Sequence, residues 1–350
     1  MSEKMLRLDE KLKRIRAGQY RPSDFIIADA KDTDMGSGVT GTGFDRSNPT
    51  APRRRSRQEF IDQIRLVVRQ NIVDIMLVSA SNLELLQEDG VFAGSQVKPA
   101  IRANDTTDCW ASVRHGVYAG RPSRPFRSAS LSRVVTGTAT PAPGAPVTGT
   151  DLGLYSVTFL NDRDADAAAL EAFADFRAEA AANNFKYFYE AFNPNVDCGL
   201  SREATGEFLN DCILRSLAGV MRADRPQFLK IPFNGPRALE ELAAFDSELV
   251  VGVLGGGGGT VRDTFELVAQ AERYGGRVAL FGRKINQAEA PLELIRLLRA
   301  VAGREISPRQ AVRAYHAALG EAKIVPVRSF DDDARITEEV LLPGAVDKAA

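Results

Sequence analysis

Short apolar runs, rich in β-branched residues, recur along the chain, and longer segments of helical period follow most of them. Eight of these runs predict β-strands, over residues 25–30, 73–80, 97–103, 154–160, 185–192, 227–233, 249–255 and 276–282. Amphipathic helices are predicted before the second, fifth and eighth runs, over residues 57–71, 165–184 and 260–276. Strands that alternate with helices and are apolar on both faces indicate a parallel sheet and an α/β fold.

Eight repeats of a strand and a helix predict a single (β/α)8 TIM barrel over residues 1–323, followed by a tail at 324–350 to which we assign no catalytic role. A doubly wound open sheet is the alternative. Long loops are predicted after strands one and three, at residues 34–58 and 117–151. Loops of this length are functional lids, subunit contacts or disordered stretches.

Charge and cysteine content narrow the class of protein. The chain of 350 residues has 45 basic and 46 acidic side chains, which predicts a small-molecule substrate and no nucleic-acid partner. Cys109, Cys198 and Cys212 form no C-x-x-C motif, which favours a reducing compartment. The charged N-terminus has no apolar h-region, and no window holds the roughly 18 apolar residues of a membrane span. We expect a cytoplasmic protein, without membrane contact, that forms a homo-oligomer.

Lys230 lies in the middle of the apolar run QFLKIPFNG. Strand alternation directs its amine into the barrel and sends Leu229 and Ile231 toward the helices. Side chains at the carboxyl ends of barrel strands converge on one pocket. There, apolar neighbours and a second cation would favour the neutral amine, which can attack a carbonyl carbon and form a Schiff base. The alternative is a lysine that extends from the strand end to solvent.

A phosphate site is predicted after strands seven and eight. Strand seven ends in five glycines, 255–259, which lead into a helix whose N-terminus carries partial positive charge, and strand eight ends in GRK. These two loops of a TIM barrel often hold a phosphate. The residues assigned to it are Gly256, Gly257, Gly258, Gly282 and Arg283. The alternative for the glycine run by itself is a flexible turn.

Carboxylates at other strand ends supply acid and base candidates. Schiff-base chemistry needs a proton shuttle, and Glu190, in the aromatic strand FKYFYEAF, is the first candidate. Phe188 shares its side of the strand, whereas Tyr187 and Tyr189 face the other way. Asp29 is the second carboxylate, placed to orient or ionise substrate hydroxyl groups. For either acid, an ordinary ion pair is the alternative. Two further cations, predicted to bind substrate, are Lys31 and Arg102.

From Asp24 to about Lys323 the chain resembles the class I, Schiff-base aldolases of the archaeal-type fructose-bisphosphate and tagatose-bisphosphate aldolase families. The closest stretches are FLKIPFNG, LGGGGGT and VALFGRKINQAEAPLELIRLLRAV. The resemblance implies an imine on Lys230, phosphate on Gly257, Gly258, Gly282 and Arg283, and a functional aspartate at Asp29.

The resemblance is weaker at three strand ends. On strand five, one family has a glutamate, which Glu190 matches, and the other has a tyrosine slightly further along, where this chain has Phe192. Strand one reads ADAKDTDMGSG instead of the usual DHG or DQR, and Arg102 stands where such barrels often have a lysine.

The implied function is a lyase of carbohydrate metabolism, a class I aldolase that cleaves or forms a phosphorylated ketose with dihydroxyacetone phosphate as donor and without a cofactor. Only His115 and His316 could offer imidazole ligands, which argues against a metal-dependent aldolase. Two alternatives stay open: a phosphosugar isomerase or epimerase with Glu190 or Asp29 as base, and a non-catalytic sugar-phosphate-binding protein. The sequence leaves open which sugar is used and whether it carries one phosphate, two, or a sulfonate.

Overall fold

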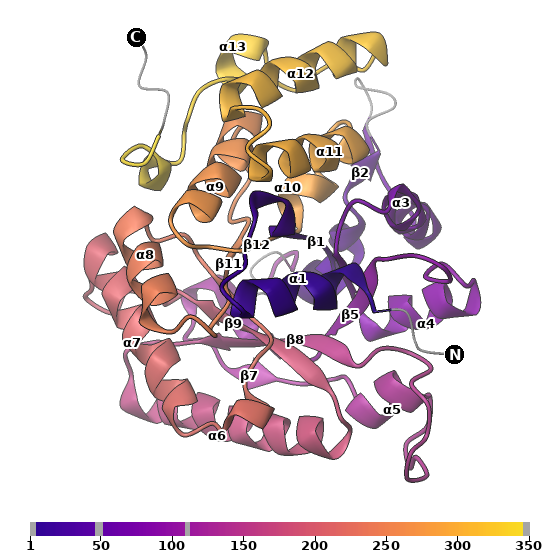
Figure 1. Ribbon diagram of the computed structural model, residues 1–350, viewed down its shortest axis with the longest axis vertical. Coiled ribbons are helices and arrows are strands. Elements are labelled where there is room, and N and C mark those ends of the chain that lie inside the picture. Colours follow the sequence, from indigo (N-terminus) through magenta and orange to yellow (C-terminus); the bar gives the residue numbers. More distant parts are fainter. Residues whose placement is uncertain (1–4, 46–51, 109–112, 346–350) are drawn as a thin grey trace.

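Eight parallel strands form a closed barrel in the computed structural model, which describes residues 5–45, 52–108 and 113–345 (Figure 1). Around the barrel the order is β1-β12-β11-β10-β9-β8-β5-β4. The strands are β1 (Ile26–Lys31), β4 (Ile75–Val78), β5 (Lys98–Arg102), β8 (Leu152–Thr158), β9 (Lys186–Phe192), β10 (Leu229–Ile231), β11 (Val251–Leu254) and β12 (Val278–Phe281). Each overlaps one predicted run, so the predicted TIM barrel is confirmed. Cys109 lies outside the described residues.

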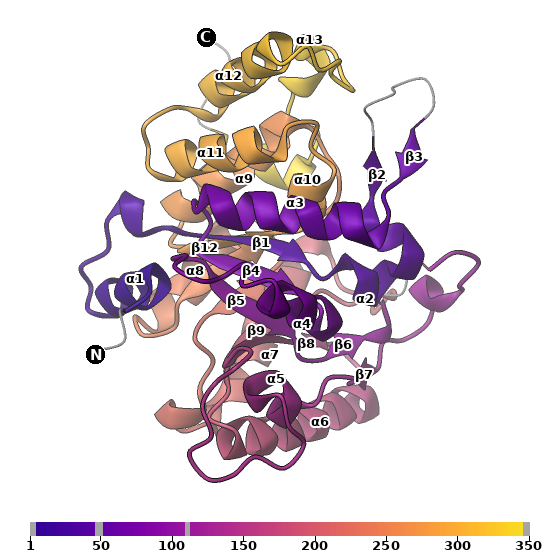
Figure 2. The same cartoon turned by 90° about the vertical axis from the view of Figure 1, so that its right-hand side faces the viewer.

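Helices surround the barrel and cover its outer face (Figure 2). The longer ones are α1 (Arg7–Arg16), α3 (Arg57–Gln70), α4 (Ala80–Glu88), α6 (Arg163–Ala182), α7 (Arg202–Ala218), α8 (Pro236–Phe245), α9 (Val261–Arg273), α11 (Pro291–Ala302) and α12 (Pro308–Glu321). The three amphipathic segments recognised in the sequence correspond to α3, α6 and α9. Ser56 and Thr260 begin α3 and α9 with capping boxes, in which each side chain accepts a hydrogen bond from the third helical N–H.

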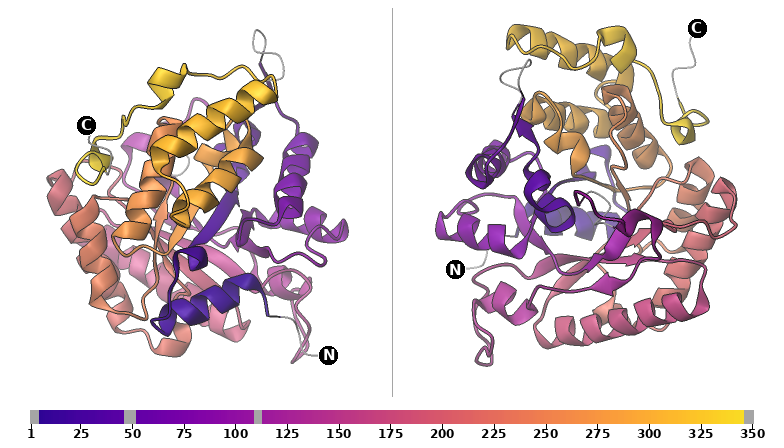
Figure 3. Two further views of the ribbon diagram at one scale, coloured as in Figure 1. Left: turned by 45° about the horizontal axis from the view of Figure 1, so that its top comes forward. Right: turned by 180° about the vertical axis from the view of Figure 1, so that it is seen from behind.

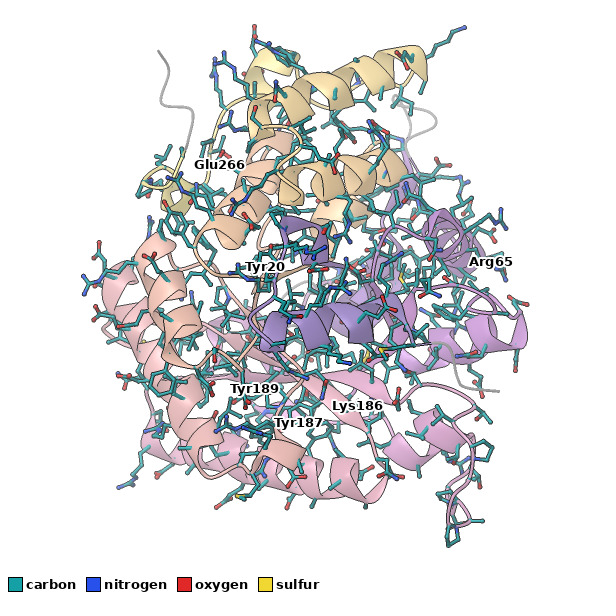
Figure 4. All side chains as sticks on the ribbon, viewed as in Figure 1. Tyr20, Arg65, Lys186, Tyr187, Tyr189 and Glu266 are labelled. Carbon is teal, nitrogen blue, oxygen red and sulfur yellow. The ribbon has the colours of Figure 1, made fainter. Side chains whose placement is uncertain are left out.

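Strand alternation divides the apolar core into two layers. Ile26, Ala28 and Ala30 of β1 face the barrel interior, and Ile27 packs outward against the helices. On β9, Phe188 points inward, while Tyr187 and Tyr189 lie on the outer side and pack against Phe173 of α6 (Figure 4). The predicted alternation on β9 is therefore confirmed.

Helix α1 closes the barrel at the end where the strands begin. Its residues Leu8, Leu12 and Ile15 join the inner apolar layer. Its basic residues converge on Asp74, which lies just before β4 and is fully buried. Lys11 Nζ lies 3.0 Å from Asp74 Oδ2. Helix α1 therefore leaves the opposite end of the barrel, where the strands end, uncovered.

The two predicted long loops carry defined structure. Segment 34–58 contains most of α2 (Thr33–Ser37), η2 (Gly38–Thr42) and the hairpin of β2 (Phe44–Asp45) with β3 (Arg53–Arg54), while its residues 46–51 lie outside the described residues. Segment 117–151 contains η4 (Tyr118–Gly120), β7 (Pro125–Phe126), which pairs with β6 (Asp105–Thr106), and α5 (Leu131–Thr136). Leu131 of α5 is fully buried in the outer core. Helix α5 therefore takes the place of a barrel helix after the third barrel strand.

The C-terminal segment packs on α9 (Figure 3). It contains α13 (Phe330–Asp333) and η6 (Glu339–Leu341), and Leu341 is fully buried in the outer core. Gln270 of α9 donates a side-chain hydrogen bond to the Leu341 carbonyl at 2.7 Å. Leu341 therefore anchors the C-terminal segment on α9, and the last five residues lie outside the described part. No helix among the described residues is both long enough and apolar enough to cross a membrane.

Candidate active site

A cavity of about 420 Å³ opens at the carboxyl ends of the barrel strands. This volume is within the usual range for small-molecule pockets. Seven charged side chains line it: Asp32, Arg102, Asp105, Asp108, Glu190, Lys230 and Arg283. They come from five strand ends, β1, β5, β9, β10 and β12, so the barrel itself brings them together.

Lys230 is at the centre of this group. Its side chain points into the barrel, whereas Leu229 and Ile231 belong to the outer core, so the predicted orientation is confirmed. Lys230 is 6% exposed, and its Nζ lies 2.5 Å from Oε1 of Glu190. The two residues are Cα partners on β9 and β10. The ammonium group is therefore buried with a carboxylate as its partner, and not in the mainly apolar surroundings that the sequence predicted.

The second oxygen of Glu190 is held by neighbouring strands. Ser156 Oγ of β8 donates a hydrogen bond to Glu190 Oε2 at 2.7 Å, and Arg102 Nη2 lies 3.4 Å from the same oxygen. Asn104 fixes the backbone of Ser156 from both sides, donating to its carbonyl at 2.8 Å and accepting from its N–H at 2.5 Å. The Glu190 carboxylate therefore has a fixed orientation, with one oxygen on Lys230 and the other on Ser156.

Arg102 connects the remaining carboxylates. Its guanidinium donates from Nε to Asp32, lies 3.2 Å from Asp105 through Nη1, and reaches Glu190 through Nη2. Burial acts to raise the pKa of Asp32, but the charges of Arg102 and Lys230 outweigh it and hold that pKa below its usual range. Asp32 is thus ionised within a network that includes both cations.

Asp29 and Lys31 do not line the cavity, contrary to the predicted roles. They follow the alternation of Ile27, so their side chains lie on the outer face of β1, where both are buried. Lys31 Nζ lies 3.0 Å from Asp29 Oδ1. Burial raises the pKa of Asp29 above its ordinary value, although Lys31 opposes the shift. The aspartate of strand one that reaches the cavity is Asp32.

The loops after β11 and β12 form one wall of the cavity. Gly255, Gly256, Gly282 and Arg283 line it, whereas Gly257 and Gly258, also predicted for phosphate, are exposed and lie beyond the lining. Gly256 has φ +64°, a left-handed conformation that favours glycine. The Arg283 guanidinium makes no hydrogen bond or ion pair with any residue that the structure describes. It is therefore available to an anion in the cavity.

The N-terminus of α9 is filled by the chain itself, which corrects the prediction that it would face the phosphate. Asp263 accepts from the N–H groups of Thr260 and Thr337, both at 2.8 Å. Asp333 accepts from the N–H of Val261 at 2.8 Å. These internal carboxylates satisfy helix donors that an anion would otherwise use.

The last basic residue of the GRK sequence also faces the C-terminal segment. Lys284 Nζ lies 2.9 Å from Glu338 Oε1, and an added Cβ at Gly259 would lie 2.8 Å from the same oxygen. Glu338 therefore contacts both the glycine segment and the loop after β12, and Arg283 is the basic residue of the GRK sequence that faces the cavity.

The site residues predicted from the sequence do not include Asp32, Asp105, Asp108 or Ser156. Asp32 and Ser156 could have been found from strand alternation, because they share the inward parity of Ala30 and Leu154. No group of three or more His, Cys, Asp and Glu side chains in the described ranges is arranged to hold a metal ion.

No protein-family model matches this chain, and no curated protein matches it in sequence. Solved structures do match in fold. An archaeal fructose 1,6-bisphosphate aldolase superposes with a TM-score of 0.59 at 15% identity, over 85% of this chain and 99% of the aldolase. A Schiff-base-forming fructose-1,6-bisphosphate aldolase gives 0.59 at 17% identity, over 84% and 99% of the two chains. The chain has the fold of these aldolases.

A protein from Corynebacterium glutamicum is also similar, with a TM-score of 0.54 and 18% identity over 85% of this chain and 98% of that protein. The resemblance to Schiff-base aldolases predicted from the sequence is therefore confirmed at the level of the fold. One archaeal aldolase, 16% identical, has been solved with its catalytic lysine covalently bound to the carbinolamine intermediate of its substrate. At such low sequence identities, the similarity establishes only the barrel fold of this chain.

Proposed function

We propose that this protein is a class I aldolase that cleaves or forms a phosphorylated ketose through a Schiff base on Lys230, with dihydroxyacetone phosphate as the donor. The observation that carries the proposal is the contact of 2.5 Å between the buried Lys230 amine and Glu190 at the base of an open cavity. A nucleophilic amine and a carboxylate in direct contact are the two groups that imine chemistry needs.

Imine formation begins when the unprotonated Lys230 amine attacks the ketone carbon of the substrate. A proton moves from nitrogen to oxygen to give a carbinolamine, and protonated oxygen then leaves as water while the nitrogen electron pair forms the C=N bond. Glu190 contacts Nζ and is therefore the group to carry protons between nitrogen and oxygen. Ser156 donates a hydrogen bond to the second oxygen of Glu190, which keeps the carboxylate oriented toward Nζ for this transfer.

Cleavage follows from the protonated imine. A carboxylate removes the proton of the substrate hydroxyl two carbons from the C=N carbon, the adjacent C–C bond breaks, and its electron pair moves into the iminium to give an enamine. The aldehyde fragment leaves, the enamine carbon takes a proton, and water releases the donor from Lys230. We assign the proton transfers to Glu190, because its carboxylate is in direct contact with the Lys230 amine.

The donor phosphate is assigned to the wall formed by Gly255, Gly256, Gly282 and Arg283. Glycine leaves the backbone open to close approach by an anion, and a guanidinium can bind phosphate through two N–H groups. Lys230 lies on β10, next to β11 in the barrel, so a phosphate at this wall would place the rest of a small donor over the amine.

The test is borohydride reduction with dihydroxyacetone phosphate, followed by intact-mass and peptide analysis. We expect a covalent adduct on Lys230 that is lost in Lys230→Met and kept in Lys186→Met, a matched lysine substitution on the neighbouring strand β9 whose side chain is exposed. The absence of an adduct under conditions in which calorimetry detects binding would overturn the aldolase and leave an isomerase or a sugar-phosphate-binding protein.

A further inference from the structure

Charge is distributed unevenly around the mouth of the barrel. The glycine segment and Arg283 follow β11 and β12, whereas Asp105 and Asp108 follow β5. In the closed order of eight strands, β5 lies four places from β11, directly across the barrel. The wall that suits an anion and the acidic wall therefore face each other, with Lys230 on β10 between them along the ring.

Asp108 gives the acidic wall an unneutralised charge. Its carboxylate accepts hydrogen bonds from Ser123 Oγ at 2.5 Å and from Thr158 Oγ1 at 3.0 Å. Both donors are neutral hydroxyl groups, and Asp108 makes no ion pair with any side chain within the described ranges. The hydroxyls fix the carboxylate in place and leave its negative charge facing the cavity.

Arg102 is the cation on this side, and it is already engaged. Its guanidinium contacts the carboxylates of Asp32, Asp105 and Glu190. A phosphate that approached Arg102 would have to displace one of these carboxylates and would meet the charges of the others. Lys230 also contacts Glu190, so two cations face these three carboxylates, and Asp108 adds a further negative charge.

We propose that the pocket takes only one phosphoryl group, that of the donor, and that the wall of Asp105 and Asp108 selects an uncharged, hydroxyl-bearing aldehyde as the second substrate. The inference rests on the proposed aldolase function. Carboxylate oxygens accept hydrogen bonds from sugar hydroxyls and repel a phosphate dianion, so the same wall attracts one kind of aldehyde and rejects the other.

In the synthetic direction the enamine of the donor on Lys230 adds to the aldehyde carbon. The enamine electron pair forms the new C–C bond, the aldehyde oxygen takes a proton, and water then frees the ketose from the lysine. The product carries one phosphate, at the donor end, and the hydroxyl-bearing end lies against Asp108.

The experiment compares glyceraldehyde with glyceraldehyde 3-phosphate, and erythrose with erythrose 4-phosphate, each with dihydroxyacetone phosphate as donor. We expect kcat/KM to be at least tenfold higher for the uncharged member of each pair. Asp108→Asn is expected to lower this preference about tenfold, because it removes the charge and keeps the shape. Asp164→Asn, an exposed acid on α6, is the matched control and leaves the preference unchanged.

Borohydride trapping of the donor, run in parallel, separates the two levels of the proposal. No adduct on Lys230 means that the aldolase function itself fails. An adduct together with equal or better use of the phosphorylated aldehydes by the wild-type protein overturns the acidic-wall inference alone. The acidic-wall inference is also overturned if the adduct forms and neither kind of aldehyde reacts. The same holds if a well-folded Asp108→Asn variant keeps the wild-type preference between the aldehydes.

Discussion

Lys230 and Glu190 are directly paired residues on adjacent barrel strands, and their charged groups are in contact at 2.5 Å. Both groups line the cavity and are almost fully buried, since Lys230 is 6% exposed and Glu190 is 1% exposed. The pair is therefore both a structural element of the barrel and the centre of the proposed chemistry. Its double role gives the first prediction.

Glu190→Gln is expected to slow imine formation with dihydroxyacetone phosphate about a hundredfold, because the amide fills the space but cannot carry protons. The rate is measured by borohydride quenching at a series of times. Glu305→Gln, at an exposed position, is the control. A Glu190→Gln variant that forms the adduct at the wild-type rate would show that another group moves the protons.

Arg283→Gln is expected to raise the KM for dihydroxyacetone phosphate by about tenfold to a hundredfold, which corresponds to the loss of one charge-assisted hydrogen bond of about 1.5–3 kcal/mol. Unphosphorylated dihydroxyacetone should be used equally well by wild type and variant, since it lacks the group that Arg283 binds. Arg309→Gln, exposed on α12, serves as the control. An equal loss with both donors would remove Arg283 from the phosphate site.

Because Lys11 of α1 is buried, we expect the free energy of unfolding to depend on pH in the alkaline range. Burial lowers its pKa to about 8, although the charge of Asp74 opposes the shift. Between pH 8 and its ordinary pKa of 10.5, the unfolded chain binds this proton more tightly than the folded one. The contribution of Lys11 to the free energy of unfolding therefore rises with pH over this window.

Urea unfolding of wild type and Lys11→Met between pH 8 and pH 10 measures this contribution. The free energy of unfolding of wild type, relative to the variant, should increase by about 1–3 kcal/mol over the window. Lys13→Met lies on the same helix at an exposed position and should follow wild type. A constant difference between wild type and Lys11→Met would mean that burial does not change the titration of this amine.

Asp263→Ala is expected to lower the free energy of unfolding by about 3 kcal/mol, because a buried charged acceptor of several backbone N–H groups is lost. Burial acts to raise the pKa of Asp263, but these donors outweigh it and hold the pKa below its usual range. The C-terminal segment should also become sensitive to trypsin at Arg328 or Arg335, as followed by limited proteolysis. Asp331→Ala, exposed on α13, is the control, and equal protease resistance in both variants would contradict the prediction.

Local pattern was enough to predict the barrel and the direction of Lys230. The eight strands are short, apolar and separated by helices of ordinary length, so alternation within each strand also placed Leu229, Tyr187 and Phe188 on the correct faces. Each of these predictions depends on residues a few positions apart, for which strand geometry leaves little freedom.

The ion pairs between the carboxylates and Arg102 could not be predicted from local sequence pattern, because the partners are far apart in the chain. Arg102 and Asp32 are 70 positions apart, and their ion pair exists only because β1 and β5 flank β4 in the closed sheet. The resemblance to Schiff-base aldolases indicates Asp29 as the functional aspartate of strand one. Strand alternation places Asp29 on the outer face of β1, with Ile27, and Asp32 on the inner face, with Ala30.

The role of the C-terminal segment was also missed. Its sequence is acidic and weakly periodic, which is typical of a peripheral tail. Asp333 accepts a hydrogen bond from the N–H of Val261 at the start of α9, and Glu338 forms an ion pair with Lys284 in the loop after β12. The segment is held in place by these contacts. The partners lie more than 50 positions earlier in the chain.

The barrel closes by pairing its first strand with its last, Ile26 of β1 beside Val278 of β12. Contacts between distant parts of a chain cost loop-closure entropy and form slowly during folding. Before closure, Asp32 and Arg283 would lie at opposite edges of an open sheet, and the cavity would not exist. In a refolding experiment, catalytic competence should therefore return in a single late kinetic phase, after most of the helical signal has been recovered.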